Sequence, residues 1–545
     1  MARAVEDGVG VRAGKMLYPI FLGQVSSGIL TAVTFIIIAR ILGPSQYGIY
    51  TFAIGFYALL NSFQAFGVGG YMAYKLPELL RKKDHEGILR AVSSSYIIAL
   101  AVCGAFTILG IAISPYVSAA FPNINASTEL LMVAASTVVV YIISTMPVNL
   151  LLGLSRSGFY ASLQVFFQAA QLVLAIGLTL AFGVMGAVSA MLFAYLLGLI
   201  PGTVFMYKAI SRHIKPRIVL PSLKELKSTI RFVWPMGVTN FLNNGSVYFA
   251  TVFLGLFVTS SALGNYGSAQ KALSLLAMIY GTFGLGLLPI FEAVREFKAR
   301  LEVNKTYLKI MNFELIAVLP VLAAAAALSV PVLHLLIGGS YQMAPLYFTL
   351  IVIGMSTYIF RTYLHYLIIS GNHTISIVKV NGISTVIVFV LLFVFVPYLS
   401  FAGYGSSVPP ILGVIVILYV LSNIIEAYLY MREVRFVFRI KFDMRKVALI
   451  YASAAVLGLV IALVYLAMNA YLALHPASLK YAAELAVGSA VAMLLYPMIL
   501  IAMKGVTRQE LQEMRSATRK LGKASRVFDG FFDYTEYIYG LLIIE

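Results

Sequence analysis

Long runs of apolar residues recur along the whole chain, separated by short polar stretches. Each run is about as long as the 20-residue helix that crosses the hydrocarbon core of a bilayer. The runs show no strand-like alternation and are too long for the strands of a membrane barrel. The pattern therefore predicts an all-α polytopic membrane protein with about fourteen transmembrane helices, at 16–39, 48–74, 91–114, 129–152, 159–182, 187–207, 230–257, 266–291, 311–336, 345–370, 375–397, 407–430, 448–471 and 481–503.

Composition supports this prediction and excludes several other classes of protein. Of the 545 residues, 61% are hydrophobic and 11% are charged, and the mean hydropathy is +0.92. Soluble domains carry about 25% charged residues, so a water-soluble protein is excluded. The single cysteine, Cys103, excludes a disulfide framework and a cysteine-based metal site. The first apolar run has no small-residue cleavage site before Arg40 and is expected to be a retained helix.

The basic residues predict which way the helices run. If the N-terminus is inside, 34 of the 39 Lys and Arg residues fall on inner segments or at their edge. The outer loops 41–47, 115–127 and 398–406 carry none. This asymmetry follows the positive-inside rule and predicts a multi-pass cell-membrane protein with both termini in the cytoplasm. The net charge of +18 is then explained by orientation and anionic lipid headgroups, and nucleic acid is not an expected partner.

The order of the helices predicts two halves and an appendix. A long basic stretch at 208–229 separates six spans from six more, and both halves begin inside, so a repeat would be parallel. Tyr47-Gly48 and Tyr266-Gly267 stand at corresponding places in the two halves. We expect four parts, namely an N-terminal six-helix bundle, a C-terminal six-helix bundle, helices 13 and 14, and a cytoplasmic amphipathic and aromatic tail, at 1–210, 211–440, 441–503 and 504–545.

The tail changes character after residue 503. A thin apolar stripe at Leu511, Met514 and Leu521 predicts an interfacial helix on the inner surface. The aromatic segment 531–544 is too short and too charged to cross a bilayer. Two alternatives stay open for it: packing against the membrane or a partner, or a loosely ordered end.

The first hairpin resembles a known family. Residues 39–70 read ARILGPSQYGIYTFAIGFYALLNSFQAFGVGG, and this run is similar to the signature of polysaccharide-export flippases. These belong to the multidrug/oligosaccharidyl-lipid/polysaccharide exporter superfamily. The resemblance implies two six-helix bundles arranged in a V, a central cavity lined by helices 1, 2, 7 and 8, and alternating access. It also implies a lipid-linked oligosaccharide cargo that moves from the inner to the outer leaflet.

Charged residues inside the spans are the first candidates for contact with cargo, because an ionisable group in hydrocarbon costs at least about 2.5–3.5 kcal/mol. Arg361 lies deep in helix 10 with His365 one turn later, and Lys271 enters helix 8 near its outer end. Arg40 ends helix 1, and Lys480 is expected to form an ion pair with Glu484. Arg361 is expected either to be a buried residue bonded to carbonyls, Glu314 or Glu426, or to supply positive charge to a wet cavity.

Neutral amides form the second group of candidates. Asn240, Asn243 and Asn244 lie on one face of helix 7, Asn61 and Gln64 lie on one face of helix 2, and Gln24 lies on helix 1. Amide side chains both donate and accept hydrogen bonds, as sugar hydroxyls do. The expected substrate-binding set therefore comprises Arg361, Lys271, Arg40, Asn240, Asn243, Asn244, Gln24, Asn61, Gln64 and His365.

These residues favour a flippase for a polyprenyl-diphosphate-linked oligosaccharide or polysaccharide repeat unit. The alternative is a cation-coupled multidrug or small-molecule exporter of the same fold, which is expected to need a mid-membrane carboxylate that the first bundle lacks. An enzyme is not expected, because no catalytic or metal-binding constellation is present in the sequence. No cofactor is expected. The sequence contains no G-x-x-x-x-G-K-[ST] motif for binding a nucleotide, so H⁺ and Na⁺ are the candidate coupling ions. Membrane lipids are the other expected partners, and a monomer is the expected state.

Overall fold

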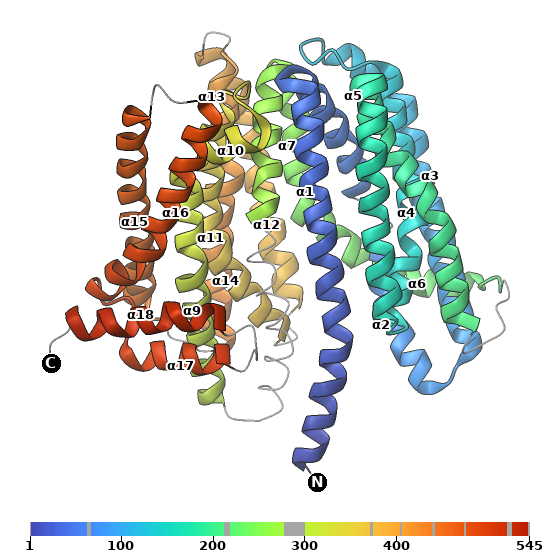
Figure 1. The fold of residues 1–545 in the computed structure, drawn as a ribbon. Helices are drawn as coiled ribbons and strands as arrows, with labels where there is room; N and C mark the ends of the chain where they lie inside the picture. The colour runs from blue at the N-terminus through green and yellow to red at the C-terminus, as the bar shows by residue number, and fades with distance from the viewer. Residues whose placement is uncertain are drawn as a thin grey trace. The chain divides into compact units, whose positions relative to one another are not determined.

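The computed structural model describes residues 2–62, 67–211, 219–276, 300–370, 374–403, 406–438, 442–472, 476–519 and 526–542. Within these ranges every regular element is a helix, which confirms the predicted all-α class. The helices are α1 (Ala2–Ser62), α2 (Val68–Lys82), α3 (His85–Ala120), α4 (Thr128–Gly153), α5 (Ser157–Ser211), α6 (Leu223–Asn240), η2 (Phe241–Gly245), α7 (Ser246–Leu254), α9 (Arg300–Ala327), α10 (Ser329–Ile337), α11 (Ala344–Ser370), α12 (Thr374–Ala402), α13 (Val408–Ile415), η3 (Val416–Leu421), α14 (Ser422–Phe438), α15 (Met444–Tyr471), α16 (Ala477–Ala502), α17 (Arg508–Arg519) and α18 (Arg526–Leu542) (Figure 1).

Ten helices in the described ranges are long and apolar enough to cross a membrane. Two of the ten contain a glycine with non-helical backbone angles: α1 breaks at Gly43 and α5 breaks at Gly183. Both glycines have positive φ, at 68° and 57°, which a residue without a Cβ adopts at little cost. Pro44 then opens the second part of α1 with a φ already suited to a helix. Each of these helices therefore covers two predicted spans, and the total of fourteen stays a prediction.

The predicted span 48–74 is wrong as one continuous helix. In the structure α1 ends at Ser62, and Gly67 adopts the left-handed conformation with φ 78° immediately before α2. That conformation cannot continue a right-handed helix, so α2 starts as a separate element. Pro77 lies inside α2, and Arg81 and Lys82 occupy its last turn, where cations complement the helix dipole.

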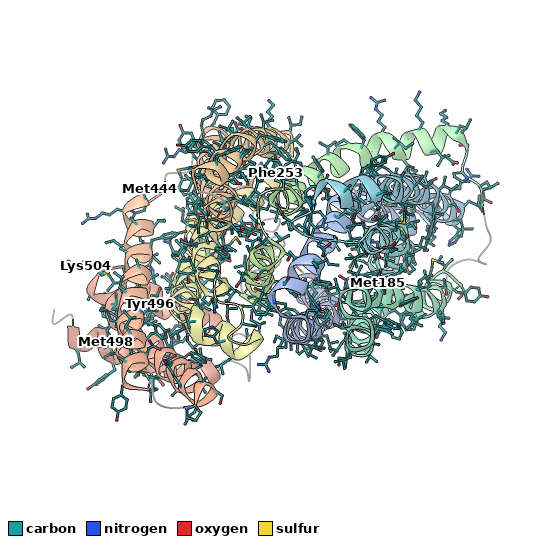
Figure 2. The ribbon with its side chains drawn as sticks, turned by 90° about the horizontal axis from the view of Figure 1, so that it is seen from above. Met185, Phe253, Met444, Tyr496, Met498 and Lys504 are labelled. Atoms are coloured by element: carbon teal, nitrogen blue, oxygen red, sulfur yellow. The ribbon has the colours of Figure 1, made fainter. Side chains whose placement is uncertain are left out.

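Packing divides the chain into two compact units. The first unit comprises Met1–Lys271 and Asn381–Val414, and the second comprises Ala272–Val380 and Ile415–Glu545. In the first unit α5 packs along both α1 and α4, and in the second unit α15 packs against α9 and α16. Figure 2 shows α15 beginning at Met444, and Tyr496 on the neighbouring α16 is buried. The expected bundle boundaries at 210, 440 and 503 are based on the repeated order of the spans, whereas the two units are based on contacts in the structure. The boundaries therefore stay a prediction.

Many large apolar side chains point outward, as expected for helices that face lipid. On α15, Leu459, Leu463 and Leu466 are exposed and follow one another at helical spacing. On α5, Val173 and Leu180 are more than half exposed. Contiguous outward apolar surface of this kind is rare on soluble monomers, so it fits a multi-pass membrane protein.

The tail forms two helices, α17 and α18, which belong to the second unit. Leu511 of the predicted stripe is buried on α17, Met514 is half-buried beside it, and Leu521 lies outside the described residues. The α17 carboxylates pair with other helices: Glu510 with Lys446 of α15, and Glu513 with Lys309 of α9.

The aromatic end of the tail is a helix rather than a loose chain. On α18, Phe532 is buried, and the hydroxyl of Tyr534 donates to the carbonyl oxygen of Leu494 at 3.0 Å. Arg515 of α17 pairs with Asp533 and Glu536 of α18. The described residues of segment 531–544 pack within the chain, against α16 and α17, which excludes a loosely ordered end for them; packing against the membrane or a partner stays a prediction.

The predicted orientation is tested by thiol labelling of intact cells. The native Cys103 is buried, whereas Gln46, Asn123, Lys82 and Lys224 are exposed. We expect a membrane-impermeant maleimide to label Gln46→Cys and Asn123→Cys at least tenfold faster than Lys82→Cys and Lys224→Cys, because the basic loops lie inside. After permeabilisation all four thiols are expected to react. Fast labelling of the two lysine positions in intact cells would show that the topology is inverted.

Candidate functional site

Among the predicted site residues of the first unit, the exposed amides lie on α1 and on the α6–η2–α7 helix. Gln24, Asn240 and Asn244 are all exposed, as their proposed contact with a polar ligand requires. The neighbouring hydroxyls on α1 are already satisfied: Ser27 donates to the carbonyl of Gly23, and Thr31 donates to Oε1 of Gln168 on α5 at 2.9 Å. The side chain of Gln24, one turn earlier, is exposed.

The predicted helix at 230–257 is helical up to Leu254 and contains a π-helical turn, η2, at Phe241–Gly245. A π-turn closes i→i+5 hydrogen bonds and adds a residue to the turn, so the residues after it rotate relative to those before it. The hydroxyl of Thr385 on α12 donates to the carbonyl oxygen of Leu242 at 3.1 Å and so stabilises the turn from outside. Such turns are frequent at functional sites.

The π-turn also changes how the helix 7 amides are placed. Asn244 lies inside η2, and its Nδ2 donates to the carbonyl of Asn240 at 3.4 Å. Asn240 is the last residue of α6, so the two amides flank the turn. The side chain of Asn243 lies outside the described residues. η2 packs against α1, which carries Gln24 before its break at Gly43 and Asn61 after it.

The helix 2 amides are described only in part. Asn61 is half-buried near the end of α1, and its Oδ1 is buried without a hydrogen-bond partner. A buried amide oxygen of this kind costs about 1–3 kcal/mol unless water or a ligand satisfies it. Gln64 lies outside the described residues.

Glycines allow the second part of α1 and the helix at 260–276 to come into close contact. A Cβ on Gly48 would lie 1.6 Å from the carbonyl oxygen of Ser260, and one on Gly264 would lie 1.9 Å from the carbonyl oxygen of Pro44. A Cβ on Gly267 would lie 2.3 Å from Oγ1 of Thr51. We call the contact made by Gly48, Gly264 and Gly267 the glycine crossing. The glycine crossing joins the second part of α1 to the helix at 260–276.

The glycine crossing contains both copies of the repeated Tyr-Gly pair. Tyr47 and Tyr266 are 3% and 0% exposed, so both rings are packed beside the glycines that follow them. The hydroxyls of Ser45 and Ser260 lie 3.0 Å apart at the edge of the crossing. The sequence similarity between 42–48 and 262–267 therefore marks two segments that touch, which sequence alone did not indicate.

The two cationic candidates of the first unit are both exposed. Lys271 lies on the helix at 260–276, one turn beyond Gly267 of the glycine crossing, and Arg40 lies on α1 just before the break at Gly43. Lys271 also follows Gln270, whose amide donates to the hydroxyl of Tyr266 at 2.8 Å. Lys271 is thus positioned by a helix whose packing is fixed through the glycine crossing.

Arg361, in the second unit, has a carboxylate partner. Its guanidinium forms an ion pair with Glu426 of α14, which is 8% exposed. It also lies 4.5 Å from the ring centroid of Tyr358, a cation–π distance. The Nε of Arg361 is buried without a hydrogen-bond partner, so the guanidinium retains an unused donor. Of the two alternatives open for Arg361, the ion pair with Glu426 is present.

His365 follows Arg361 by one turn and makes the next contact on the same pair of helices. Its Nδ1 lies 3.1 Å from the hydroxyl of Tyr430 on α14. Arg361–Glu426 and His365–Tyr430 have the same sequence separation, so α11 and α14 run in the same direction. The sequence offered Glu426 as one alternative but gave no sign of Tyr430, because residues 65 positions apart carry no local signal of contact. Tyr358 lies only three residues before Arg361 on α11, a spacing that brings side chains together on one helix face.

The expected ion pair between Lys480 and Glu484 is absent from the described chain. The Lys480 ammonium instead lies 5.9 Å from the centroid of the Tyr481 ring. Glu484 is 1% exposed, and neither of its carboxylate oxygens has a hydrogen-bond partner. The i,i+4 spacing allowed the pair, but in the structure the Glu484 carboxylate is buried on α16, which packs against α10.

Similarity to known proteins indicates the family of this chain. A family model described as "Polysaccharide biosynthesis protein" matches residues 15–294, just over half of the chain. No curated protein sequence matches the chain.

Solved structures share the fold over most of the chain. "Lipid II flippase MurJ, inward closed conformation" has a TM-score of 0.67 at 13% identity and covers 88% of this chain and 98% of that one. Outward-facing and inward-facing forms of a multidrug resistance MATE family transporter of the MOP superfamily have TM-scores of 0.53 and 0.52. Their identities are 15% and 16%, and each covers 77% of this chain and 94% of the transporter. The matched structures are a flippase and transporters rather than enzymes.

Proposed function

Because this chain belongs to the polysaccharide biosynthesis protein family, we propose that it is a flippase for a lipid diphosphate-linked oligosaccharide or polysaccharide repeat unit. The cargo moves from the inner to the outer leaflet by alternating access between two six-helix bundles. The observation that carries the proposal is the family match over residues 15–294. The shared fold with a lipid II flippase, over 88% of the chain, supports it.

The amides of the first unit suit the sugar part of such a cargo. Gln24, Asn240 and Asn244 are exposed, and the contact of η2 with α1 brings two of their helices together. A glycan carries many hydroxyl groups, each of which both donates and accepts a hydrogen bond, and amides supply both partners without charge. We assign Asn61 and, from the sequence, Asn243 and Gln64 to the same role.

The cations suit the diphosphate. Lys271 and Arg40 are the exposed candidates in the first unit, and Arg361 with His365 is the candidate in the second. Arg361 already has Glu426 as a partner, so a diphosphate would compete for the guanidinium or use its remaining donors. Phosphate oxygens accept charge-assisted, bidentate hydrogen bonds from arginine, which a lysine does not reproduce.

The second candidate function is a cation-coupled multidrug or small-molecule exporter. It is favoured by the fold shared with MATE family transporters over 77% of the chain. Binding a cationic drug and H⁺ or Na⁺ calls for a carboxylate within the membrane. Of the carboxylates of the spans, Glu129 lies in the first turn of α4, and Glu314, Glu426 and Glu484 belong to the second unit. Charge and amide chemistry therefore favour the anionic, sugar-bearing cargo.

Reconstitution into liposomes tests the proposal. We expect the protein to move a fluorescent polyprenyl-diphosphate sugar between leaflets, measured as the fraction that a membrane-impermeant reductant quenches. An Asn240→Ala/Asn244→Ala variant removes about two hydrogen bonds to the cargo, each worth about 0.5–1.5 kcal/mol, so the rate should fall by about tenfold.

A matched control removes two exposed amide side chains that lie on other elements. Asn123→Ala/Gln512→Ala changes exposed positions in the 121–127 loop and on α17, and its rate should equal that of the parent protein. Transport of a lipophilic cation, with no movement of the lipid-linked sugar, would establish the exporter function instead.

A further inference from the structure

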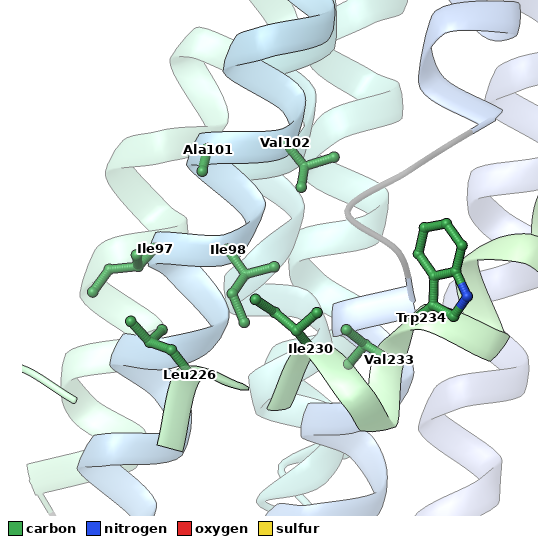
Figure 3. A pocket seen from close by; sticks show the side chains of 8 residues that line it. All are labelled: Ile97, Ile98, Ala101, Val102, Leu226, Ile230, Val233 and Trp234. Atoms are coloured by element: carbon green, nitrogen blue, oxygen red, sulfur yellow. The ribbon is translucent and has the colours of Figure 1, made fainter. Parts of the chain in front are cut away.

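An apolar groove runs between α3 and α6 in the first unit. Ile97, Ile98 and Ala101 line it from α3, and Leu226, Ile230 and Trp234 line it from α6 (Figure 3). Its volume is about 340 Å³, within the range of about 300–1,000 Å³ found for small-molecule sites. The groove is separate from the amide face, because Asn240 and Asn244 lie beyond the end of its lining on α6.

The lining determines what kind of molecule can occupy the groove. Every lining side chain is apolar apart from the indole N–H of Trp234, and that side chain is 55% exposed. Water in such a groove would lose hydrogen bonds without finding polar partners. In a chain that crosses a membrane, the abundant apolar molecule beside α3 is the hydrocarbon chain of a lipid. The groove therefore fits an acyl chain.

The groove is held in shape by contacts on the other sides of α6. Ser222 and Glu225 form a capping box that fixes the start of the helix. Glu225 also accepts from Arg90 of α3 at 3.1 Å, which ties the two walls of the groove together at one end. Phe232 stacks on Tyr74 of α2 with ring centroids 5.6 Å apart. The walls are thus positioned before any lipid binds.

Positive charge lies directly beside the apolar lining. Lys227 and Arg231 follow Leu226 and Ile230 by one residue each, which places them about 100° further around α6. Both are exposed, and neither has an ion-pair partner among the described residues. Lys224 lies on the same basic side one turn earlier. A cationic edge along an apolar groove is complementary to a lipid whose headgroup carries a phosphate without a compensating positive charge.

We propose that the α3–α6 groove is a binding site for an anionic phospholipid of the bilayer, with an acyl chain against Ile97, Ile230 and Trp234 and the phosphate on Lys227 and Arg231. The site goes beyond the proposed transport function, since its ligand is a resident membrane lipid and not the cargo. Phosphatidylglycerol is the simplest lipid with this chemistry. Phosphatidylcholine offers the same chains, but its choline cancels the phosphate charge.

The only tryptophan of the chain makes the groove directly observable. Trp234 is in the lining, so bromine atoms on a lipid acyl chain in the groove quench its fluorescence. In nanodiscs with increasing mole fractions of brominated lipid, we expect brominated phosphatidylglycerol to reach half-maximal quenching at a mole fraction at least threefold lower than brominated phosphatidylcholine. Raising the salt concentration should weaken this preference, because it screens the phosphate contacts.

Two variants separate the site from general lipid contact. Lys227→Gln/Arg231→Gln should quench equally with both lipids while keeping the phosphatidylcholine curve of the parent protein. Lys504→Gln/Arg508→Gln removes the same charge from two exposed residues near α17 and should keep the threefold preference. Equal quenching of the parent protein by the two lipids, or a preference that survives Lys227→Gln/Arg231→Gln, would overturn the proposal. Quenching by neither lipid would mean that another part of the protein fills the groove, and would also overturn it.

Discussion

Replacing Arg361 by Gln is expected to lower the free energy of unfolding by about 3–5 kcal/mol, because it leaves a buried carboxylate without its partner. Glu426 is 8% exposed and pairs with Arg361. An Arg361→Gln/Glu426→Gln variant should recover most of the lost stability, since two neutral amides can hydrogen-bond where the ion pair was. Thermal unfolding in detergent, with the single and double variants compared side by side, measures the difference.

An exposed ion pair provides the control. Lys309 and Glu513 also pair between helices, at 2.9 Å, but the lysine side chain is 46% exposed. Lys309→Gln should therefore change stability by no more than about 1 kcal/mol. If Arg361→Gln is as stable as Lys309→Gln, the Arg361–Glu426 pair does not hold α11 and α14 together.

The same double variant decides whether Arg361 contacts cargo. Once stability is restored, a loss of lipid-linked sugar transport reports on the missing positive charge rather than on folding. We expect transport to stay at least tenfold below that of the parent protein. Transport at the parental rate would show that Arg361 is a structural residue, and the proposed anion contacts would then be Lys271 and Arg40.

A Gly48→Ala substitution is expected to open the glycine crossing. The added methyl group would lie 1.6 Å from the carbonyl oxygen of Ser260, so the backbones of α1 and the helix at 260–276 must move apart. Overpacking of this kind costs typically about 1–3 kcal/mol. If the crossing separates during alternating access, this cost falls only on the closed form, and the population shifts toward the open one.

Thiol labelling reports the shift. Tyr47 is 3% exposed, so a Tyr47→Cys thiol in the closed crossing should react slowly, and adding Gly48→Ala should speed the reaction at least tenfold. Gly177→Ala is the matched control, because no atom lies within 4 Å of the position that its Cβ would take. Unchanged labelling, together with a lower melting temperature, would mean that the crossing is a fixed structural contact and not a gate.

The sequence determined the class of the protein because hydrophobicity is a local property. Twenty consecutive apolar residues must form a helix in a bilayer, whatever surrounds them, since no water satisfies the backbone there. The first-hairpin motif at 39–70 likewise pointed to the family that the match over 15–294 then established. Even the breaks at Gly43 and Gly183 fall in the short gaps 40–47 and 183–186 between predicted spans.

Only the tertiary structure decided which residues meet. The pairing of Arg361 with Glu426 depends on α11 and α14 lying side by side, and the turn at η2 depends on packing, with Thr385 of a distant helix bonded to it. The glycine crossing depends on two segments more than 200 residues apart. Burial and partner choice are sums over neighbours from the whole chain, so a carboxylate such as Glu426 cannot be distinguished by its local sequence from one that faces a cavity. For this protein the sequence determined the all-α membrane class, and the tertiary structure determined where the helices break and which partner each polar side chain has.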